Sequence, residues 1–286
     1  MGGSFMNVRI GVIDVGGGLR GAFAAGVLEF CAQNAIDFDV CFGISAGSAN
    51  LTSYLSRQTG RNYIFYMDYV HRHQYMSFRN FLKTGSYIGF DYVYNTLSGT
   101  DGENPLDYEA LKANPAEFIV IATDANTGKP VYFTKDDMSL NNYDICKASC
   151  SIPVICKPYS INGVPCFDGA LSDPVPIQKA FQTGLDKVVL LLTLPENLIR
   201  KPDKDIKIAK ILKRTYPNAA KELETRAEKY NQGIKTAQEY AKEGKVLILS
   251  PDDTCGVSTL SKSKEGIRKL YEKGFAEGEK IKRFLL

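Results

Sequence analysis

The chain has 286 residues, of which 44% are hydrophobic and 23% charged, which suits one large globular domain or two small ones and excludes a disordered chain. Its formal net charge is +3, from 35 Lys and Arg against 32 Asp and Glu, too small for the strongly basic face of a nucleic-acid-binding protein. Nucleic acid is therefore not an expected partner.

Several features bear on location and cofactors. The N-terminal stretch MGGSFMNVRIGVIDV shows no secretory signal, and the longest wholly apolar run, VVLLL at 188–192, is about a quarter of a membrane-spanning helix. The seven cysteines are an odd set, which suggests reduced thiols, and the spacing of Cys146, Cys150 and Cys156 is not a zinc pattern. We expect a cytoplasmic protein with no transmembrane segment, no metal and no other cofactor.

Strands and helices alternate in the first part of the chain. The apolar segment 8–15 predicts a strand, and 20–34 has the apolar spacing of a helix. Segment 37–44 predicts a second strand, and a helical pattern follows from 46. Each strand therefore leads through a glycine-containing turn into a helix.

Four more apolar segments predict strands, at 117–125, 130–134, 186–194 and 245–251. Strands that are apolar throughout and separated by helices indicate a mainly parallel sheet covered on both faces. We therefore predict a three-layer α/β/α fold and a single domain over 1–286. Its core spans about 8–195, and a mostly helical C-terminal region spans about 200–286 with one strand near 245–250.

The first turn contains GGGLRG at 16–21, which fits G-x-G-x-x-G. In a dinucleotide-binding fold this motif lies between a strand and the start of a helix. An acidic residue at the C-terminal end of the second strand then binds the ribose. Here Asp37 and Asp39 open the second strand instead. Backbone N–H groups in such a turn can equally bind an oxyanion, so the glycine motif alone leaves both interpretations open.

The second turn, GISAG at 43–47, fits G-x-S-x-G. In a nucleophile elbow the turn is sharp, and the positions of Gly43 and Gly47 must be small because the turn pushes Ser45 outward and crowds its neighbours. Two successive strand-to-helix turns would lie side by side at the carboxyl edge of one parallel sheet. The combination predicts a serine nucleophile beside an oxyanion hole.

The proton acceptor for this serine is not the late histidine of a hydrolase triad ordered Ser, Asp or Glu, His, because no histidine follows His71 and His73. An acidic candidate is Asp168 in CFDGALSDPVPIQKA, which follows an apolar run and precedes small residues that leave its carboxylate room to enter a site. Composition alone favours an Asp-Gly turn at Asp168. Asp173 is better explained as a helix N-cap.

These motifs resemble those of the patatin-like phospholipase family, in particular its bacterial cytoplasmic members. The resemblance is carried by GGGLRGAFAAGVLEF, GISAGSAN and DGALSDPVPIQKA, with support from FIVIATDANTGKPVYF and KASCSIPVICKPYSINGVPCFDGA, and it covers most of the chain. It implies a patatin-like fold and a Ser-Asp dyad without histidine. Val15 stands where related chains often have an acidic or small polar residue, but its backbone, not its side chain, shapes the turn.

The resemblance also implies a role for individual residues. Ser45 is the expected nucleophile, Asp168 the expected base, and the backbone of Gly17 and Gly18 the expected oxyanion hole, with Arg20 at the family's basic position. Further glycines are expected to support the motifs: Gly16, Gly21, Gly43, Gly47 and Gly169.

The expected activity is that of a lipid acyl hydrolase of phospholipase A or esterase type, working through an acyl-enzyme intermediate. The alternative within the same chemistry is a carboxylesterase or thioesterase acting on soluble short-chain acyl substrates. From other classes come a nucleotide-binding module that uses GGGLRG and a catalytically silent scaffold. The intact serine, acid and glycines argue against the scaffold.

Two segments raise the question of lipid contact. Segment 62–94 is rich in Tyr and Phe and could line an acyl-chain groove or form a lid, although packing on the core is the more frequent role for any one such residue. Segment 200–214 interleaves basic and apolar residues and could approach an anionic membrane. A solvated helix face is the favoured interpretation there, because acids recur at 222–228. Peripheral membrane contact is kept as a hypothesis.

Overall fold

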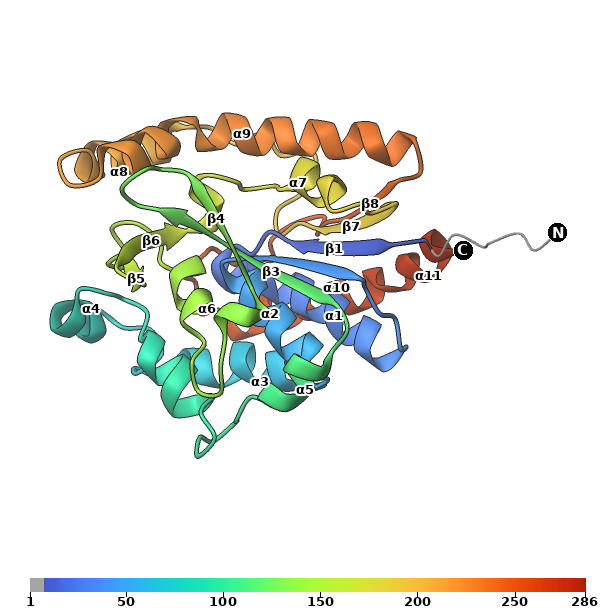
Figure 1. Cartoon of the computed structure of the whole chain (residues 1–286), viewed down its shortest axis with the longest axis horizontal. Coiled ribbons are helices and arrows are strands. Elements are labelled where there is room, and N and C mark those ends of the chain that lie inside the picture. The colour runs from blue at the N-terminus through green and yellow to red at the C-terminus, as the bar shows by residue number, and fades with distance from the viewer. Residues whose placement is uncertain (1–7) are drawn as a thin grey trace.

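The computed structural model describes residues 8–286, in which one mixed β-sheet lies between two layers of helices (Figure 1). The strands are β1 Ile10–Asp14, β2 Val40–Ile44, β3 Glu117–Asp124, β4 Pro130–Thr134, β5 Tyr159–Ile161, β6 Val164–Asp168, β7 Lys187–Leu191 and β8 Val246–Leu249. Their order is β5-β6-β3-β2-β1-β7-β8, with β4 paired to β3. The predicted three-layer α/β/α fold is confirmed.

The centre of the sheet is parallel. β1 pairs in parallel with β2 and β7, β2 with β3, and β7 with β8. Parallel strands are covered on both faces, and for this reason their sequences are apolar throughout. Every residue of β2 is buried, in agreement with this rule.

One edge of the sheet is antiparallel, since β4 and β6 pair with β3, and β5 pairs with β6. β5 and β6 form a hairpin whose two-residue turn is Asn162 and Gly163, both at positive φ. The sequence analysis missed these two strands, which are only three and five residues long. The Asn-Gly pair was the available signal, because two-residue hairpin turns need positive φ at both positions.

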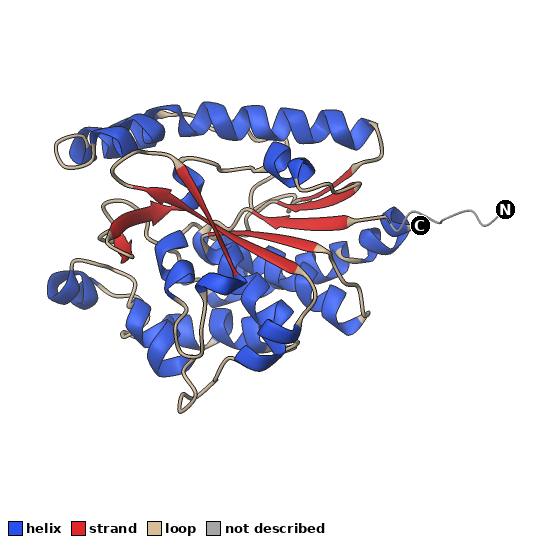
Figure 2. Cartoon of the chain, in the orientation of Figure 1, coloured by secondary structure: helices blue, strands red, loops and turns tan. Residues whose placement is uncertain are grey.

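Helices cover both faces of the sheet (Figure 2). One face carries α7 Ile177–Gln182, α8 Asp203–Leu212 and α9 Pro217–Lys242; the other carries α1 Ala22–Gln33, α2 Ala46–Leu55, α3 Arg61–Met67, α5 Tyr108–Ala113, α6 Asp144–Ser149 and α10 Lys264–Glu277. At the periphery lie α4 Phe78–Thr84 and α11 Glu279–Leu285. Short helical turns are η1 Gly18–Gly21, η2 Tyr69–His71, η3 Tyr92–Leu97, η4 Lys135–Asp137 and η5 Gly169–Leu171.

The parallel strands contribute side chains to two separate cores. Successive side chains of a strand point to opposite faces. On β1, Val12 packs in one core with Phe23 of α1, whereas Ile13 packs in the other with Tyr230 and Ile234 of α9. The sheet is thus held by apolar contacts on both sides, which fixes the edge where its parallel strands end.

The C-terminal region contributes to the sheet and to both helical layers. β8 extends the sheet beyond β7, α9 covers one face, and α10 packs along α1 on the other. Glycines allow α1 and α10 to meet closely: a Cβ on Gly26 would lie 2.0 Å from the carbonyl oxygen of Tyr271, and one on Gly274 would lie 1.9 Å from that of Phe23. The two helices therefore touch backbone to backbone.

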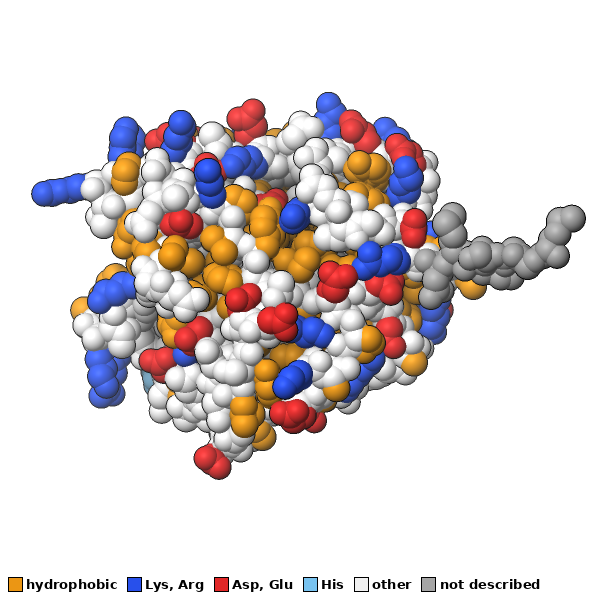
Figure 3. Space-filling model, in the orientation of Figure 1, with side chains coloured by type: hydrophobic (Ala, Val, Ile, Leu, Met, Phe, Trp, Pro, Cys, Tyr) orange, Lys and Arg blue, Asp and Glu red, His pale blue; other side chains and the backbone are white. Residues whose placement is uncertain are grey.

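Charged side chains of both signs are interspersed over the face shown in Figure 3, with apolar side chains between them. This mixing agrees with the net charge of +3. Among residues 8–286, no helix combines the length and the hydropathy that a bilayer-spanning segment needs.

Candidate active site

The glycine turn and the serine turn are neighbours, because β1 and β2 are adjacent parallel strands whose carboxyl ends lie side by side. β1 leads into residues 15–18, and β2 leads directly into Ser45. The two backbones touch: a Cβ on Gly16 would lie 2.1 Å from the carbonyl oxygen of Ile44. Only glycine fits at this position, so Gly16 is required for the approach between the two turns.

Ser45 occupies a strained turn between β2 and α2. Its φ of 54° and ψ of −130° lie outside the regions that residues with a side chain normally adopt. A second serine secures this conformation: the N–H of Ser45 donates to the hydroxyl of Ser149 at 2.8 Å, and that hydroxyl donates to the carbonyl oxygen of Ile121 at 2.6 Å. The turn is thus anchored on the neighbouring strand β3.

The glycines around the serine turn are needed for space. A Cβ on Gly43 would lie 2.6 Å from the Cα of Ser48, and one on Gly47 would lie 2.3 Å from the carbonyl oxygen of Asp14. Gly21 is equally restricted, because its Cβ would lie 2.4 Å from the hydroxyl of Tyr66. The small residues of the motifs therefore let α2 lie close against the ends of β1 and β2.

Asp168 reaches Ser45 through the register of β3. Ile44, which precedes the serine, pairs with Ile121, and the next residue of β3, Ala122, pairs with Asp168 at the end of β6. The Ser45 hydroxyl lies near the Asp168 carboxyl group and acts to lower its pKa. The two residues predicted as a pair are thus brought together by three strands.

The Asp168 carboxyl group is buried, and both it and Ser45 are 5% exposed. Burial raises the pKa of Asp168 above the usual value. The nearby Ser45 hydroxyl, the hydrogen bond from the N–H of Ala170 and the positive charges of Arg226 and Arg200 act in the opposite direction. A carboxylate with a raised pKa is a stronger proton acceptor than a solvated one.

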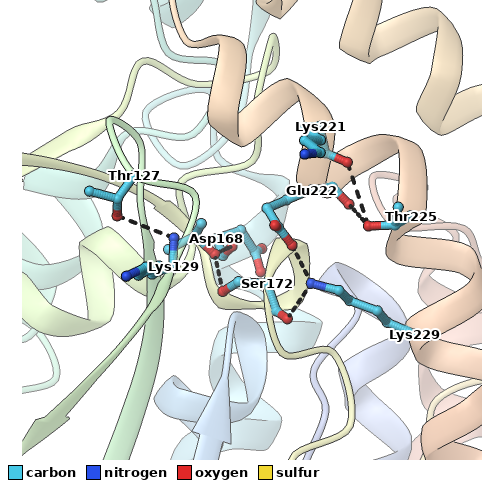
Figure 4. Close-up of polar contacts among 9 residues, drawn as sticks. Thr127, Lys129, Asp168, Ser172, Lys221, Glu222, Thr225 and Lys229 are labelled. Carbon is cyan, nitrogen blue, oxygen red and sulfur yellow. Dashed lines mark hydrogen bonds and ion pairs between the residues drawn. The ribbon is translucent and has the colours of Figure 1, made fainter.

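Helix α9 braces the turn that follows Asp168 (Figure 4). The ammonium group of Lys229 pairs with Glu222 and donates to the carbonyl oxygen of Ser172 at 3.4 Å. The hydroxyls of Ser172 and Thr123 are hydrogen-bonded at 2.8 Å, and Thr123 also donates to the carbonyl oxygen of Asp168 at 2.9 Å. The aspartate is therefore held from β3 on one side and from α9 on the other.

Gly169, which follows Asp168, is also required for a steric reason. A Cβ on Gly169 would lie 2.2 Å from the carbonyl oxygen of Ile121. Ile121 is the same residue that accepts the hydrogen bond from Ser149. One peptide group of β3 therefore positions both the serine turn and the aspartate turn.

The glycine turn presents two unoccupied backbone donors. Gly17 and Gly18 have φ of 127° and 60°, conformations that glycine adopts without strain. The N–H of Leu19 donates to the carbonyl oxygen of Thr259 at 3.0 Å, whereas the N–H groups of Gly17 and Gly18 have no acceptor within residues 8–286. Free amide donors beside a serine can stabilise a negative oxygen.

Arg20 lies directly after this turn. Its Nη1 donates to the hydroxyl of Thr259 at 3.0 Å, and its Nε is buried without a partner among the described residues. Burial lowers the pKa of Arg20 to about 10, and the nearby charge of Arg200 acts in the same direction. A Cβ on Gly17 would lie 3.3 Å from Nη2, so the guanidinium is close to the donors of the glycine turn.

Asp14 is a structural acid of the site that the sequence analysis missed. It is fully buried; one carboxylate oxygen accepts from the N–H of Gly16 and the other from the side-chain amide of Asn50, each at 2.9 Å. Burial raises its pKa to about 6. Asp14 links the glycine turn to α2. The available signal was an acid placed as the last residue of an apolar strand.

Two threonines from later in the chain complete the glycine turn. Thr193, just after β7, donates to the carbonyl oxygen of Gly16 at 2.5 Å. Thr259, after β8, accepts from Leu19 and lies so near the turn that a Cβ on Gly18 would be 2.2 Å from its carbonyl oxygen. No local pattern marks either threonine, because their roles arise only from the fold.

A cavity of about 100 Å³ opens beside Ser45. Its wall is mainly apolar, and segment 62–94 supplies much of it, including Phe65, Tyr66, Phe90 and Tyr94. Aromatic and aliphatic walls with few polar groups are typical of sites for apolar ligands.

The other segments noted in the sequence lie outside this cavity. His71 and His73 are exposed and do not line it. Segment 200–214 contains α8, in which Asp205 is buried in an ion pair with Arg226 while Ile211 is exposed. The helix therefore packs against α9 through the side that carries Asp205, Ala209 and Leu212.

A glycine-rich turn and a serine turn at the carboxyl edge of a parallel sheet are typical of enzymes that hydrolyse acyl esters. The family model for patatin-like phospholipases matches residues 15–181 of the chain. The protein therefore belongs to the patatin-like phospholipase family, whose members are lipid acyl hydrolases in general. A second model, a domain of unknown function (DUF6363), matches residues 216–285, which contain α9, β8, α10 and α11.

The chain is also similar to individual proteins and solved structures. The chain is 29% identical over 203 residues to the uncharacterized protein YjjU of Escherichia coli (strain K12), a match that covers 69% of this chain and 56% of that protein. The match thus spans little more than half the length of that relative. Among solved structures, the chain is similar to VipD from Legionella pneumophila, with a TM-score of 0.46 and 12% identity, over 96% of this chain and 66% of that one.

Proposed function

We propose that the protein is a serine lipid acyl hydrolase of phospholipase A or esterase type, with Ser45 as nucleophile and Asp168 as general base. One observation carries this proposal: the register of β2, β3 and β6 brings Ser45 and the buried carboxyl group of Asp168 together at one edge of the sheet. The unoccupied N–H groups of Gly17 and Gly18 beside it support the same assignment. Membership of the patatin-like phospholipase family supports ester hydrolysis in general.

In the acylation step, the Ser45 hydroxyl oxygen bonds to the ester carbonyl carbon while its proton moves to Asp168. The carbonyl oxygen becomes an oxyanion and accepts hydrogen bonds from Gly17 and Gly18. The carbon–oxygen bond to the alcohol then breaks, and the alcohol leaves with the proton from Asp168. The product of this step is an acyl-enzyme.

In the deacylation step, water attacks the acyl carbon and Asp168 takes the proton of the water. A second oxyanion forms in the same place and collapses, which releases the acid and returns the proton to Ser45. The buried position of Asp168 supports its role in both steps, because a raised pKa favours proton transfer to the carboxylate. Arg20 adds positive charge beside the oxyanion donors.

The apolar cavity beside Ser45 supports an acyl chain as the part of the substrate that enters the protein. A second candidate is a carboxylesterase or thioesterase acting on soluble short-chain acyl substrates. Relative kcat/KM values for esters and thioesters of increasing chain length distinguish the two candidates.

We also propose that the chain forms one domain, because β8 belongs to the same sheet as β1 and because Thr259 contacts the glycine turn. The free cysteines among residues 8–286 support a reducing location such as the cytoplasm.

Peripheral contact with a lipid surface is proposed at α4, where Phe78 and Leu82 are 65% and 74% exposed. Flotation with anionic and neutral liposomes tests it. The expected result is binding that is lost in Phe78→Ser/Leu82→Ser. Failure of the wild type to float with either liposome removes the membrane proposal without affecting the proposed chemistry.

The central test is labelling with a fluorophosphonate probe together with hydrolysis of p-nitrophenyl esters and phospholipids. Wild type is compared with Ser45→Ala, Asp168→Asn and Ser139→Ala, a control at an exposed serine. Labelling and turnover are expected to disappear in Ser45→Ala and to persist in Ser139→Ala. Wild-type rates in Ser45→Ala reject the assignment of the nucleophile.

A further inference from the structure

We propose that the cavity beside Ser45 ends in an anion-binding site, formed by Arg61 and Tyr143, for a carboxylate at the far end of the substrate's acyl chain. The inference rests on the proposed function and names a substrate class for it: monoesters of dicarboxylic acids. Arg61, Tyr143 and Ser45 all line this one cavity.

Arg61 is a buried guanidinium with unused hydrogen-bonding capacity. It is 7% exposed, and its Nη groups donate to the hydroxyls of Ser53 and Ser98, each at 2.8 Å, and to the carbonyl oxygen of Asn104 at 3.3 Å. The group also lies 4.5 Å above the ring of Phe65. Its Nε is buried and has no partner within residues 8–286.

The charge of Arg61 is not offset by an acid. Within residues 8–286 it forms no ion pair, and no Asp or Glu lines the cavity. Its electrostatic neighbours are tyrosines, Tyr69, Tyr75, Tyr94 and Tyr143, and burial lowers its pKa to about 10. A guanidinium at pH 7 is still a cation under these conditions.

Two other cations within the protein, Lys147 and Arg226, are neutralised in place. Lys147, with a side chain 3% exposed, pairs with Asp144 and Asp91. Arg226 pairs with Asp205 through two hydrogen bonds. A buried charge without a counterion is strongly destabilising. Arg20 and Arg200 also form no ion pair among residues 8–286, but neither lines the cavity, so Arg61 is the arginine whose counterion would arrive with a ligand bound there.

Tyr143 provides the second donor. Its side chain is 1% exposed, and its hydroxyl is buried without a hydrogen-bond partner in the described part of the chain. Buried tyrosine hydroxyls nearly always have a partner. Two unsatisfied donors, from Arg61 and Tyr143, thus belong to one cavity that contains no acid. A carboxylate can accept from both, because its two oxygens have free lone pairs.

The spacing along α2 gives an approximate chain length. Ser45 caps the helix and Ser53, which binds Arg61, lies eight residues further along, so the helical rise separates them by about 12 Å. An extended chain advances about 3.5 Å for every three bonds, so this gap corresponds to roughly ten bonds. A dicarboxylic acid of about nine carbons matches it. Its ester carbonyl would lie at Ser45 and its free carboxylate at Arg61.

The test compares p-nitrophenyl monoesters of nonanedioic acid with two neutral analogues, the nonanoate and the ω-methyl ester of the same diacid. Wild type is expected to prefer the free acid in kcat/KM. Arg61→Met is expected to reduce this preference on the order of 100-fold, the loss typical of removing one partner of a buried ion pair. Tyr143→Phe, which keeps the packing, is expected to reduce it about tenfold.

Arg57→Met and Tyr92→Phe serve as matched controls, because both residues lie outside the cavity. They are expected to retain the wild-type preference. A wild type that hydrolyses the neutral esters without preferring the free acid overturns the inference and leaves the proposed function intact. A preference that survives both Arg61→Met and Tyr143→Phe also overturns it.

Binding of nonanedioate gives a readout that does not depend on turnover. The diacid is expected to raise the melting temperature of wild type but not that of Arg61→Met. If no ester is hydrolysed, the proposed function fails, and this measurement alone decides the anion site. Absence of stabilisation in wild type rejects the site.

Discussion

The carbonyl oxygen of Thr259 accepts a hydrogen bond from the N–H of Leu19 at 3.0 Å. This bond connects the segment after β8 to the glycine turn after β1, and Arg20 adds a second bond to the Thr259 hydroxyl. The region matched by the domain of unknown function thus shapes the turn that carries the free amides of Gly17 and Gly18. The C-terminal region is part of the site.

Gly18→Ala is expected to lower kcat by on the order of 10² to 10³, the effect of losing an oxyanion donor. The reason is steric and conformational: the new Cβ would lie 2.2 Å from the Thr259 carbonyl oxygen, and φ is +60°. The measurement is kcat with a p-nitrophenyl ester. Gly163→Ala is the control, because it also introduces a side chain at positive φ but meets no atom within 4 Å. Equal losses in the two variants contradict the prediction.

The pH profile of kcat/KM is expected to rise with pH as Asp168 loses its proton, because only the carboxylate can accept the proton of Ser45. Burial raises the pKa of Asp168, so the midpoint of the acid limb is expected above the usual aspartate value of about 3.9. Arg200→Met removes a charge that lowers this pKa, and the limb is expected to move to higher pH. A limb that moves to lower pH, or stays in place, refutes the assignment of Asp168 to this limb.

Asp14 is expected to make stability depend on pH. Its pKa in the folded protein is about 6, above the unfolded value, so its contribution is fully present below about pH 4 and is lost as pH rises through 6. A shift of about two units corresponds to about 3 kcal/mol. Asp14→Asn cannot titrate, so its free energy of unfolding relative to wild type is expected to increase between pH 4 and 6.5.

Urea denaturation at several pH values measures this difference. Asp101→Asn, at an exposed acid, is the control and is expected to run parallel to wild type. A constant difference between Asp14→Asn and wild type across the range indicates that Asp14 does not titrate there.

Lys229→Met is expected to lower kcat several-fold with little change in KM, because Lys229 braces the turn after Asp168 through Ser172 and does not line the cavity. Lys221→Met, on the same helix, is the control (Figure 4). Lys229 positions the turn that follows Asp168, the proposed base. The rise of kcat/KM at low pH is therefore also expected to shift in Lys229→Met. Identical profiles in both variants would assign Lys229 a role in stability only.

The glycine turn and the serine turn of the candidate site were predictable because their signals are local. Glycines after an apolar strand, and G-x-S-x-G before a helix, specify backbone shape within a few residues, and parallel strands bring such turns to one edge. The β5–β6 hairpin was missed although Asn162 and Gly163 carried its signal. Asp14 also had a local signal, as an acid closing an apolar strand.

Other parts of the site had no such signal. Thr259 meets the glycine turn only because β8 joins the sheet and α10 packs on α1. Arg61 stands in an aromatic segment where a basic residue usually marks a solvated surface; its burial depends on Ser53 and Ser98 from other elements. Such long-range contacts become visible only when the chain is folded.

The position of Thr259 after β8 has a consequence for biosynthesis. A ribosome makes the glycine turn and Ser45 early, but the carbonyl group that orders Leu19 is translated only after β8. Because domains fold once their residues have emerged, a nascent chain that has not yet reached Thr259 carries Ser45 without the bond that orders the glycine turn. Under the proposed function, ester cleavage therefore waits until the segment after β8 has been made and folded.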